Sequence, residues 1–272
     1  MALLLLPCVS WKPSSPSQSA FPPSSVARQP PPALAGRLSR RAALHQALLP
    51  AAACFVACPL PSRAFDNRLP PDELELKYKT PRTPGPKPTD IGPDAAGGLK
   101  PCIDGKPHCF SSSPETFEDN DLYNADYGTT ADWLVEPFRY EMALPAAVDD
   151  VKAAIAAYPP GQNGVDGGGF KVIEERVAAD SAYIYVQFEA RRRGYIDDME
   201  FSLKDGIANV RTSSRLGYLD MGVNAKRFNW FAARLGGIKG WRTKPILSKG
   251  HEEYFALNGV TDAEVVLARP KS

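Results

Sequence analysis

Residues 195–227 of this 272-residue chain read YIDDMEFSLKDGIANVRTSSRLGYLDMGVNAKR, and this stretch decides the fold. Asp205 and Gly206 lie between two runs in which apolar and polar residues alternate. Asp-Gly in this setting predicts a β-hairpin, because both central residues of the favoured two-residue turn need positive φ. The turn also sets the register of the hairpin, so that Lys204 faces Ile207.

This register predicts a hairpin with one apolar and one polar face, since side chains alternate along a strand. The cross-strand pairs of the apolar face are Leu203–Ala208, Phe201–Val210 and Met199–Thr212. Those of the polar face are Ser202–Asn209, Glu200–Arg211 and Asp198–Ser213. Opposite charges therefore meet across the ladder at Glu200 and Arg211. Asp197 falls on the apolar face, where its carboxylate needs a partner such as Ser214 or a capping role at a β-bulge.

The same stretch resembles the domain of unknown function 1499 family. The matching runs are IDDMEF (196–201), VRTSSRLGY (210–218), DMGVN (220–224), the pair Lys226-Arg227 and, upstream, PHCFSS (107–112). The resemblance covers residues 100–235, with His108 where Asn is usual, Thr212 where Ser is usual and Leu219 where Ser is usual. It implies membership of a bacterial and plastid family whose biochemical activity is unassigned.

The first 64 residues contain six Lys or Arg and no Asp or Glu, which is typical of organellar transit peptides. Within them, SRRAAL (39–44), an apolar run at 47–60 and the triplet Ser62-Arg63-Ala64 resemble a twin-arginine export signal with its cleavage site. Residues 1–64 are therefore predicted to direct the protein to the chloroplast and on to the thylakoid lumen. The alternative is that the run 47–60 is retained as a thylakoid membrane anchor.

The rest of the chain is predicted to form one domain between two less regular segments. Residues 65–100 are rich in Pro, Gly and charge, which predicts a Pro-rich linker. Residues 101–237 form the domain, and 238–272 form a C-terminal extension with a short strand at 263–267. Removal of 1–64 takes away six of the 32 Lys and Arg residues, leaving 26 against 31 Asp and Glu. This mildly acidic balance argues against nucleic acid as a partner.

Two helices are predicted, one on each side of the strands. Apolar residues at helical spacing, with Pro145 in the first turn, predict a helix over 145–158. A second helix over 224–235 is predicted to be capped by Asn224 and ended by Gly236-Gly237. Its buried stripe is Phe228, Phe231 and Leu235, with Lys226, Arg227 and Arg234 lying elsewhere.

The order of elements predicts an α+β fold: helix, four-stranded antiparallel sheet, helix, with an irregular Cys-containing N-terminal segment. Besides the hairpin, the strands are 170–177 and 183–190, and Gly167-Gly168-Gly169 is a flexible connection leading into them, not a phosphate loop. Aromatic residues are expected over the sheet edge: Tyr123, Tyr127, Trp133, Phe138 and Tyr140. The helices cover the apolar face, and the polar face is exposed or covered by the Cys-containing segment.

Cys102 and Cys109 are the two cysteines outside the targeting segment, which holds the other three of the five. Three interpretations stay open for this pair: a structural disulfide, two unpaired buried thiols, or a metal site that includes His108. The spacing matches no established zinc signature.

The candidate functional residues form a polar set in and after the hairpin. Its members are Asp197, Asp198, Glu200, Arg211, Ser213, Arg215, Tyr218, Asp220, Asn224 and Arg227. The carboxylates could serve a metal or acid–base site, but cross-strand ion pairing accounts for most of these charges. No nucleophile stands beside a base, so no catalytic residue, metal or cofactor is predicted. Arg191-Arg192-Arg193 could contact an acidic partner or lipid head groups, although a charge run at a strand end is more often solvated.

These observations predict a non-enzymatic lumenal or lumen-facing protein that assists assembly or maintenance of a photosynthetic membrane complex, such as a photosystem, through protein–protein contacts. Peripheral membrane association is compatible with this role. Two alternatives are an enzyme or a small-ligand or metal-binding protein that uses the polar face, and a redox-regulated lumenal protein that uses Cys102 and Cys109.

Overall fold

The computed structural model describes residues 65–77, 82–89, 91–102, 107–113 and 130–266. The targeting signals predicted within 1–64 lie outside these ranges, as do Tyr123 and Tyr127. In the described part of the chain, no helix is long and apolar enough to cross a bilayer.

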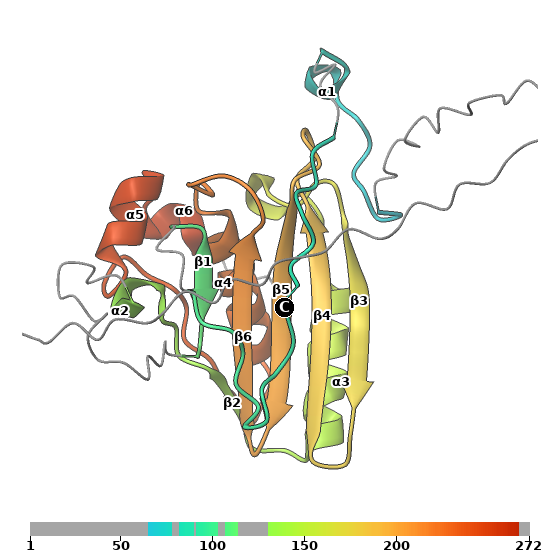
Figure 1. Ribbon diagram of the computed structural model, residues 1–272, viewed down its shortest axis with the longest axis vertical. Helices are drawn as coiled ribbons and strands as arrows, with labels where there is room; N and C mark the ends of the chain where they lie inside the picture. Colours follow the sequence, from blue (N-terminus) through green and yellow to red (C-terminus); the bar gives the residue numbers. More distant parts are fainter. Residues whose placement is uncertain (1–64, 78–81, 90, 103–106, 114–129, 267–272) are drawn as a thin grey trace, which may run out of the picture. The chain divides into compact units, whose positions relative to one another are not determined.

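The fold is α+β, built on an antiparallel sheet of seven strands (Figure 1). The order is β3-β4-β5-β6-β2-β7, and β1 also pairs with β6. The strands are β1 Cys109–Ser111, β2 Phe138–Tyr140, β3 Phe170–Val177, β4 Ser181–Glu189, β5 Ile196–Lys204, β6 Ile207–Ser214 and β7 Trp241–Arg242. The helices are α1 Glu73–Lys77, α2 Thr130–Trp133, α3 Leu144–Ala156, α4 Val223–Gly236, α5 Glu252–Asn258 and α6 Asp262–Val265, with a 3₁₀ turn at Gln162–Gly164.

The prediction of four strands is wrong, because the sheet contains three further strands. These were missed because each is only two or three residues long. β1 and β2 lie one after the other along the free edge of β6, which they pair at residues 211–213 and 207–208. β7 continues the sheet beyond β2. Strands of two or three residues are too short to show an alternating pattern, and here they are defined by the partner strand. Phe138 and Tyr140, predicted to pack over the edge, belong to β2.

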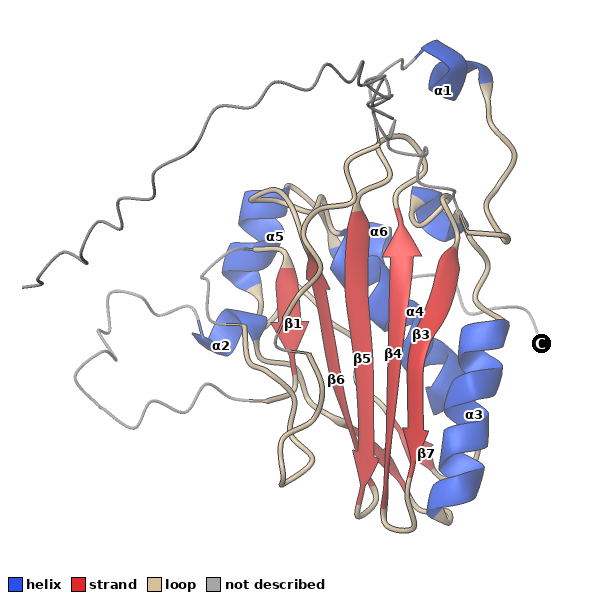
Figure 2. Ribbon diagram, turned by 45° about the vertical axis from the view of Figure 1, so that its right-hand side comes forward, coloured by secondary structure: helices blue, strands red, loops and turns tan. Residues whose placement is uncertain are grey.

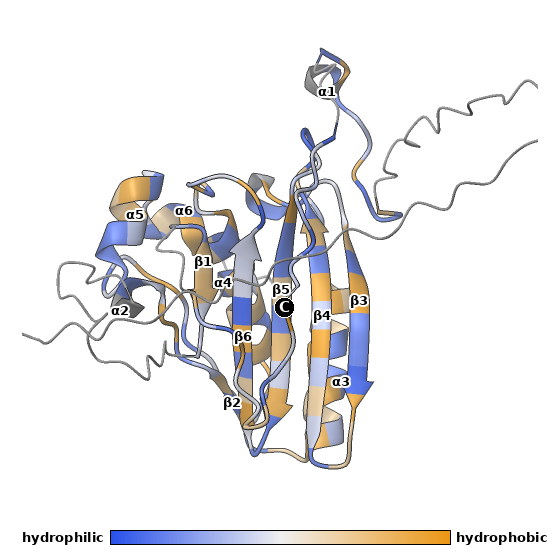
Figure 3. Ribbon diagram, in the orientation of Figure 1, coloured by the Kyte–Doolittle hydropathy of each residue, from blue (hydrophilic) through white to orange (hydrophobic). Residues whose placement is uncertain are grey.

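The predicted hairpin register is confirmed. β5 and β6 pair as Glu200 with Arg211, Phe201 with Val210 and through to Asp197 with Ser214. Asp205 and Gly206 both have positive φ, 52° and 77°, as the two-residue turn requires. Apolar and polar residues alternate along both strands (Figure 3). Each strand therefore has one apolar and one polar face, and a different layer of the structure packs on each.

The apolar face packs against α3 and α4, which lie behind the sheet (Figures 1 and 2). The stripe predicted on α4 is buried, and the ring centroids of Phe201 and Phe231 lie 5.3 Å apart. Tyr158, just after α3, stacks on Phe231 with centroids 5.5 Å apart. The chain after α4 joins the same core, where Tyr254 and Val265 are fully buried.

The opposite, polar face is covered by residues 82–89 and 91–102, called the covering segment below, which the composition suggested as part of a linker. The described residues of this segment form no helix or strand and run along β5 and β6 (Figure 1). Leu99 and Ile91 pack with Tyr183 and Tyr185 of β4 in a second, smaller apolar cluster. Backbone contacts add to this packing, because the side-chain amide of Asn209 donates to Gly97 O at 2.9 Å. The polar face is therefore an interior layer.

Two local predictions after the hairpin are wrong. Asn224 does not cap α4; the helix begins after Gly222, and the Asp220 carboxylate accepts the backbone N–H groups of Gly222 (3.0 Å) and Asn224 (2.9 Å). The predicted strand at 263–267 is replaced by α6, with Leu267 outside the described residues. Thr261 and Glu264 form a capping box there, which starts a helix.

Candidate functional site

Glu200 is buried on the polar face and bound by three groups. Its carboxylate accepts hydrogen bonds from Tyr183 OH and from the backbone N–H of Gly92, both at 2.8 Å. The predicted cross-strand partner, Arg211, is present but more distant, with Nη1 3.4 Å from Oε2. Burial, and next the neighbouring Glu200 charge, raise the pKa of Tyr183 above its usual range. Glu200 thus joins β5, β4 and the covering segment.

Asp198 forms the second ion pair of this layer, with Arg215. The pair is bidentate: Arg215 Nε donates to Oδ2 at 2.8 Å and Nη2 donates to Oδ1 at 2.7 Å. Tyr185 OH donates to the same Oδ1 at 2.5 Å. Burial disfavours charge on Arg215, but the hydrogen bonds that it donates to Asp198 and the charge of that carboxylate outweigh burial and raise the pKa of the guanidinium. Charge-assisted, bidentate geometry of this kind makes a strong, fixed contact.

On the other face, Arg227 lies at the centre of a buried ionic cluster. The prediction that it lies away from the buried stripe of α4 is wrong, because its side chain is fully buried. Nε and Nη2 bind the two oxygens of Asp166 at 2.8 and 2.5 Å, and Nη2 also binds Asp197 Oδ2 at 2.8 Å. Tyr158 OH donates to Asp166 at 2.5 Å. Two carboxylates thus compensate one buried cation, which is what makes its burial possible.

Asp197 has the predicted position on the apolar face, and its partners are Arg227 and the predicted Ser214. Burial raises the pKa of Asp197 to about 6, against the opposing effect of Arg227 and of the Ser214 hydrogen bond. Its side chain is 13% exposed, whereas that of Asp166 is 2% exposed. Asp197 is therefore a carboxyl group at the edge of the core whose pKa is raised to about 6.

The remaining predicted residues do not join one cluster. Asp220 caps α4 and accepts a hydrogen bond from Tyr254 OH at 2.8 Å. Asn224 links α4 to β6 and to the Cys-containing segment through Thr212 Oγ1 (2.6 Å) and His108 O (2.9 Å). Tyr218 is 56% exposed. The predicted polar set is thus divided between the two faces of the sheet, the start of α4 and the surface.

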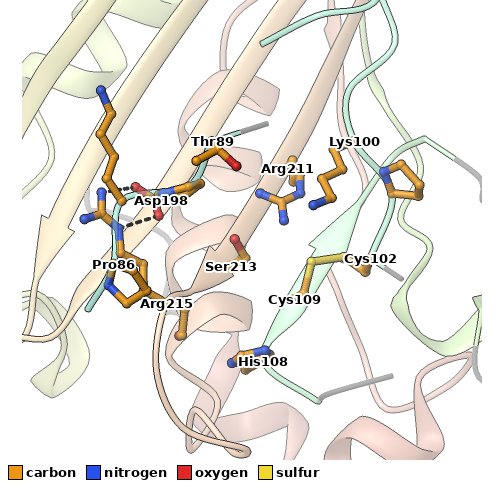
Figure 4. Close-up of a pocket in the computed structure, with 14 residues that line it drawn as sticks. Pro86, Thr89, Lys100, Cys102, His108, Cys109, Asp198, Arg211, Ser213 and Arg215 are labelled. Carbon is orange, nitrogen blue, oxygen red and sulfur yellow. Dashed lines mark hydrogen bonds and ion pairs between the residues drawn. A yellow bond between two sulfur atoms is a disulfide. The ribbon is translucent and has the colours of Figure 1, made fainter. Parts of the chain in front are cut away.

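Arg211, Ser213 and Arg215 line a cavity of about 290 Å³ where the covering segment crosses β6 (Figure 4). Its other walls are residues 86–89, residues 100–102 and the Cys-containing segment at 108–109. Thr89, Lys100 and Ser213 lie around the guanidinium of Arg211 (Figure 4). This is the place where the polar residues of the hairpin converge on open space.

Cys102 and Cys109 form a disulfide in the wall of this cavity, with Cα atoms 5.8 Å apart. Of the three interpretations left open by the sequence, the structure contains the disulfide. Within the described residues, no group of three or more His, Cys, Asp or Glu side chains is arranged to hold a metal ion. The disulfide ties residues 100–102 to β1.

A second hollow of about 690 Å³ lies beside the loop that joins β6 to α4. Leu216, Leu219 and Val223 line it together with the polar edge of the Arg227 cluster, Asp166 and Asp197. Tyr218 and Met221 in this loop are 56% and 60% exposed. Large apolar side chains are thus presented to solvent next to a concave surface.

The comparisons with known proteins identify the family. The family described as "Protein of unknown function (DUF1499)" matches residues 98–235. The chain belongs to the DUF1499 family. No curated protein and no solved structure is a significant match to the chain. The DUF1499 match begins inside the covering segment and ends within α4, so it contains β1 to β6 and both ion pairs of the polar face, Glu200–Arg211 and Asp198–Arg215.

Sequence reasoning missed three kinds of residue in this DUF1499 domain. Tyr183 and Tyr185 complete the hydrogen bonding of Glu200 and Asp198, and their i, i+2 spacing on the strand before the hairpin was a usable signal. Asp166, the main partner of Arg227, follows a 3₁₀ turn and adopts φ 57°. Thr89 lies in the Pro-rich segment. No local sequence pattern indicates the role of Asp166 or Thr89.

Proposed function

We propose that this DUF1499 protein is a non-enzymatic chloroplast protein, lumenal or facing the thylakoid lumen, that assists assembly or maintenance of a photosynthetic membrane complex through protein–protein contacts. The composition of residues 1–64 supports the address. The paired state of Asp198 and Glu200 supports a structural role for these carboxylates over an acid–base role. The partner is proposed to dock on the loop between β6 and α4.

The observation that carries the proposal is the way in which this loop presents Tyr218 and Met221. Both side chains are more than half exposed, and both residue types are enriched in protein–protein interfaces. Met221 has φ 55°, a conformation that non-glycine residues adopt at a cost. Asn258 holds the loop in place by accepting the backbone N–H groups of Asp220 (3.0 Å) and Met221 (2.9 Å).

A loop held in this way loses little conformational entropy when a partner binds, so more of the contact energy remains as affinity. The adjacent hollow, about 690 Å³ with Leu216 and Leu219 in its lining, offers a recess for a side chain of the partner. Fixed, exposed aromatic and thioether side chains beside a recess are the features of an interface hot spot.

The test is quantitative co-purification from thylakoids after mild solubilisation. The wild-type protein is compared with Tyr218→Ser/Met221→Ser, and with Val177→Ser as the control, since Val177 is 55% exposed on β3 at the sheet edge. Subunits of one photosynthetic complex should be enriched with the wild type and the control and lost with the loop variant. Recovery of the wild-type protein without such subunits, or equal enrichment with all three proteins, would contradict the proposal.

A further inference from the structure

The cavity beside the disulfide has the chemistry of an anion site. Four cationic side chains line it, Lys87, Lys100, Arg211 and Arg215, together with a single carboxylate among its described lining residues, that of Asp198. Asp198 is already satisfied, because Arg215 binds both of its oxygens and Tyr185 OH binds one of them. Among the described lining residues, positive charges therefore outnumber negative ones, in a recess where screening by water is reduced.

Arg211 has incomplete hydrogen bonding. Its side chain is 11% exposed, its Nε is buried, and that Nε has no hydrogen-bond partner among the described residues. Its contact with Glu200 is a single one at 3.4 Å, while Glu200 has two shorter donors in Tyr183 and Gly92. A buried guanidinium N–H without an acceptor is costly. An acceptor in the cavity would remove that cost.

The hydroxyl groups around Arg211 indicate which acceptor fits. Ser213 Oγ lies below the guanidinium and Thr89 Oγ1 lies above it, on the side of Asp198 (Figure 4). A guanidinium binds oxyanions through parallel N–H donors. Two hydroxyl donors on either side would bind further oxygens, which suits a tetrahedral anion better than a planar carboxylate. The volume of about 290 Å³ is at the lower limit of small-molecule pockets, so the ligand is small.

We propose that this cavity binds a tetrahedral oxyanion, a phosphate or the phosphate group of a small ester, with Arg211 and Ser213 as its principal donors and Thr89 and Lys100 around it. The proposal goes beyond the partner-binding role of the loop between β6 and α4, because Tyr218 and Met221 do not line this cavity. The source of the phosphate is either a free anion or a lipid head group, since both offer the same oxygens.

The first experiment is isothermal titration of the purified full-length chain with inorganic phosphate at constant ionic strength. We expect saturable binding of one phosphate per chain. Arg211→Gln should weaken it about 10- to 100-fold, because a hydrogen bond from a charged donor contributes about 1.5–3 kcal/mol. Ser213→Ala should weaken it about 2- to 10-fold. The matched control is Arg242→Gln, which removes an arginine that is 71% exposed on β7, and it should leave phosphate binding unchanged.

A second arm distinguishes the two sources by flotation with vesicles of phosphatidylglycerol and with vesicles of neutral galactolipid. Binding to the anionic vesicles that Arg211→Gln abolishes assigns the site to a head group, whereas phosphate binding without vesicle binding assigns it to a free anion. If Arg211→Gln fails to fold, Ser213→Ala still tests the site. The proposal is overturned by absence of saturable phosphate binding to the wild-type chain, or by an equal loss with Arg242→Gln.

Discussion

Replacement of Arg227 by Met should be among the most destabilising single substitutions in this domain. The guanidinium is fully buried and makes three hydrogen bonds to Asp166 and Asp197. Met fills a similar volume and favours helix, so the main effect is electrostatic. Removal of one partner from a buried ion pair costs about 3–5 kcal/mol, because it leaves buried charge uncompensated. We expect a loss of about 3–5 kcal/mol in unfolding free energy at pH 7.

The cost should fall as the pH is lowered. Without Arg227, the charge that opposes burial at Asp197 is lost and the pKa of this carboxyl rises further, so the folded variant retains a proton that the wild type has lost. Each such proton reduces the difference in unfolding free energy by about 1.4 kcal/mol per pH unit. Because the wild type itself binds this proton around pH 6, the recovery between pH 7 and pH 5 should be about 1.4 kcal/mol. The assay is urea unfolding followed by tryptophan fluorescence at both pH values.

Arg234→Met is the matched control, since Arg234 is exposed on the same helix, α4, and its loss should change stability by less than about 0.5 kcal/mol. A second variant, Asp166→Asn/Arg227→Met/Asp197→Asn, should recover part of the lost stability because no charge is left unpaired. A cost for Arg227→Met below about 1 kcal/mol at pH 7, or one that grows between pH 7 and pH 5, would refute the reasoning.

Three other predictions follow from the same contacts. The folded-state pKa of Asp197 is about 6, above its ordinary value of 3.8, so the folded protein binds this proton more tightly than the unfolded chain. The free energy of unfolding should therefore fall by about 3 kcal/mol as the pH rises from about 4 to 6. Asp197→Asn should flatten the profile of unfolding free energy against pH in this range. Reduction of the Cys102–Cys109 disulfide should cost about 2.5 kcal/mol, from the loop-entropy relation, measured by denaturant unfolding with and without reductant; an unchanged midpoint would contradict it. A double-mutant cycle of Glu200→Ala and Arg211→Ala should give a coupling of about 0.2–1 kcal/mol, well below the cost of Glu200→Ala alone, because Glu200 has other donors; a coupling equal to that cost would show that Arg211 is its main partner.

The hairpin could be predicted from the sequence because its determinants are local. Asp205 and Gly206 set the turn, and the alternation on either side of them set the faces, so the register from Asp197–Ser214 to Lys204–Ile207 is as expected. The strands β1, β2 and β7 could not be predicted in the same way. They are two or three residues long, and each is a strand only because a partner lies beside it, in the case of β1 and β6 about a hundred residues further along the chain.

The helical spacing of Arg227 indicated that it lies on the buried face of α4, but its charge argued against burial. Arg227 and Phe231 are four residues apart, so they lie on the same face of α4, and Phe231 was correctly predicted to be buried. A charged residue at such a position needs a compensating partner, and here the partner is Asp166, 61 residues away in a loop. Local periodicity thus indicates the face, but it contains no information about the loop that makes burial of the charge possible.

The covering segment illustrates a different limit. Pro and Gly in this segment correctly predict the lack of helix and strand in its described residues, 82–89 and 91–102, because these residues disfavour both. They do not predict attachment to the sheet. Attachment depends on two isolated apolar residues, Ile91 and Leu99, that pack with Tyr183 and Tyr185, more than eighty residues later in the sequence. Contacts between single residues far apart in the sequence produce no periodic pattern, so they can be recognised only in the three-dimensional structure.

The covering segment also explains why the candidate anion site lies where it does. Burial of Asp198 and Glu200 is tolerated because every oxygen finds a donor, and for Glu200 the segment itself supplies one, the N–H of Gly92. Arg211 faces the same segment at residues 86–89 but finds no acceptor there for Nε. The layer thus completes the hydrogen bonds of its buried carboxylates but leaves Arg211 with an unsatisfied donor beside an open volume. Buried polar groups that lack a partner within the protein are expected at functional sites, where a binding group is kept available to a ligand.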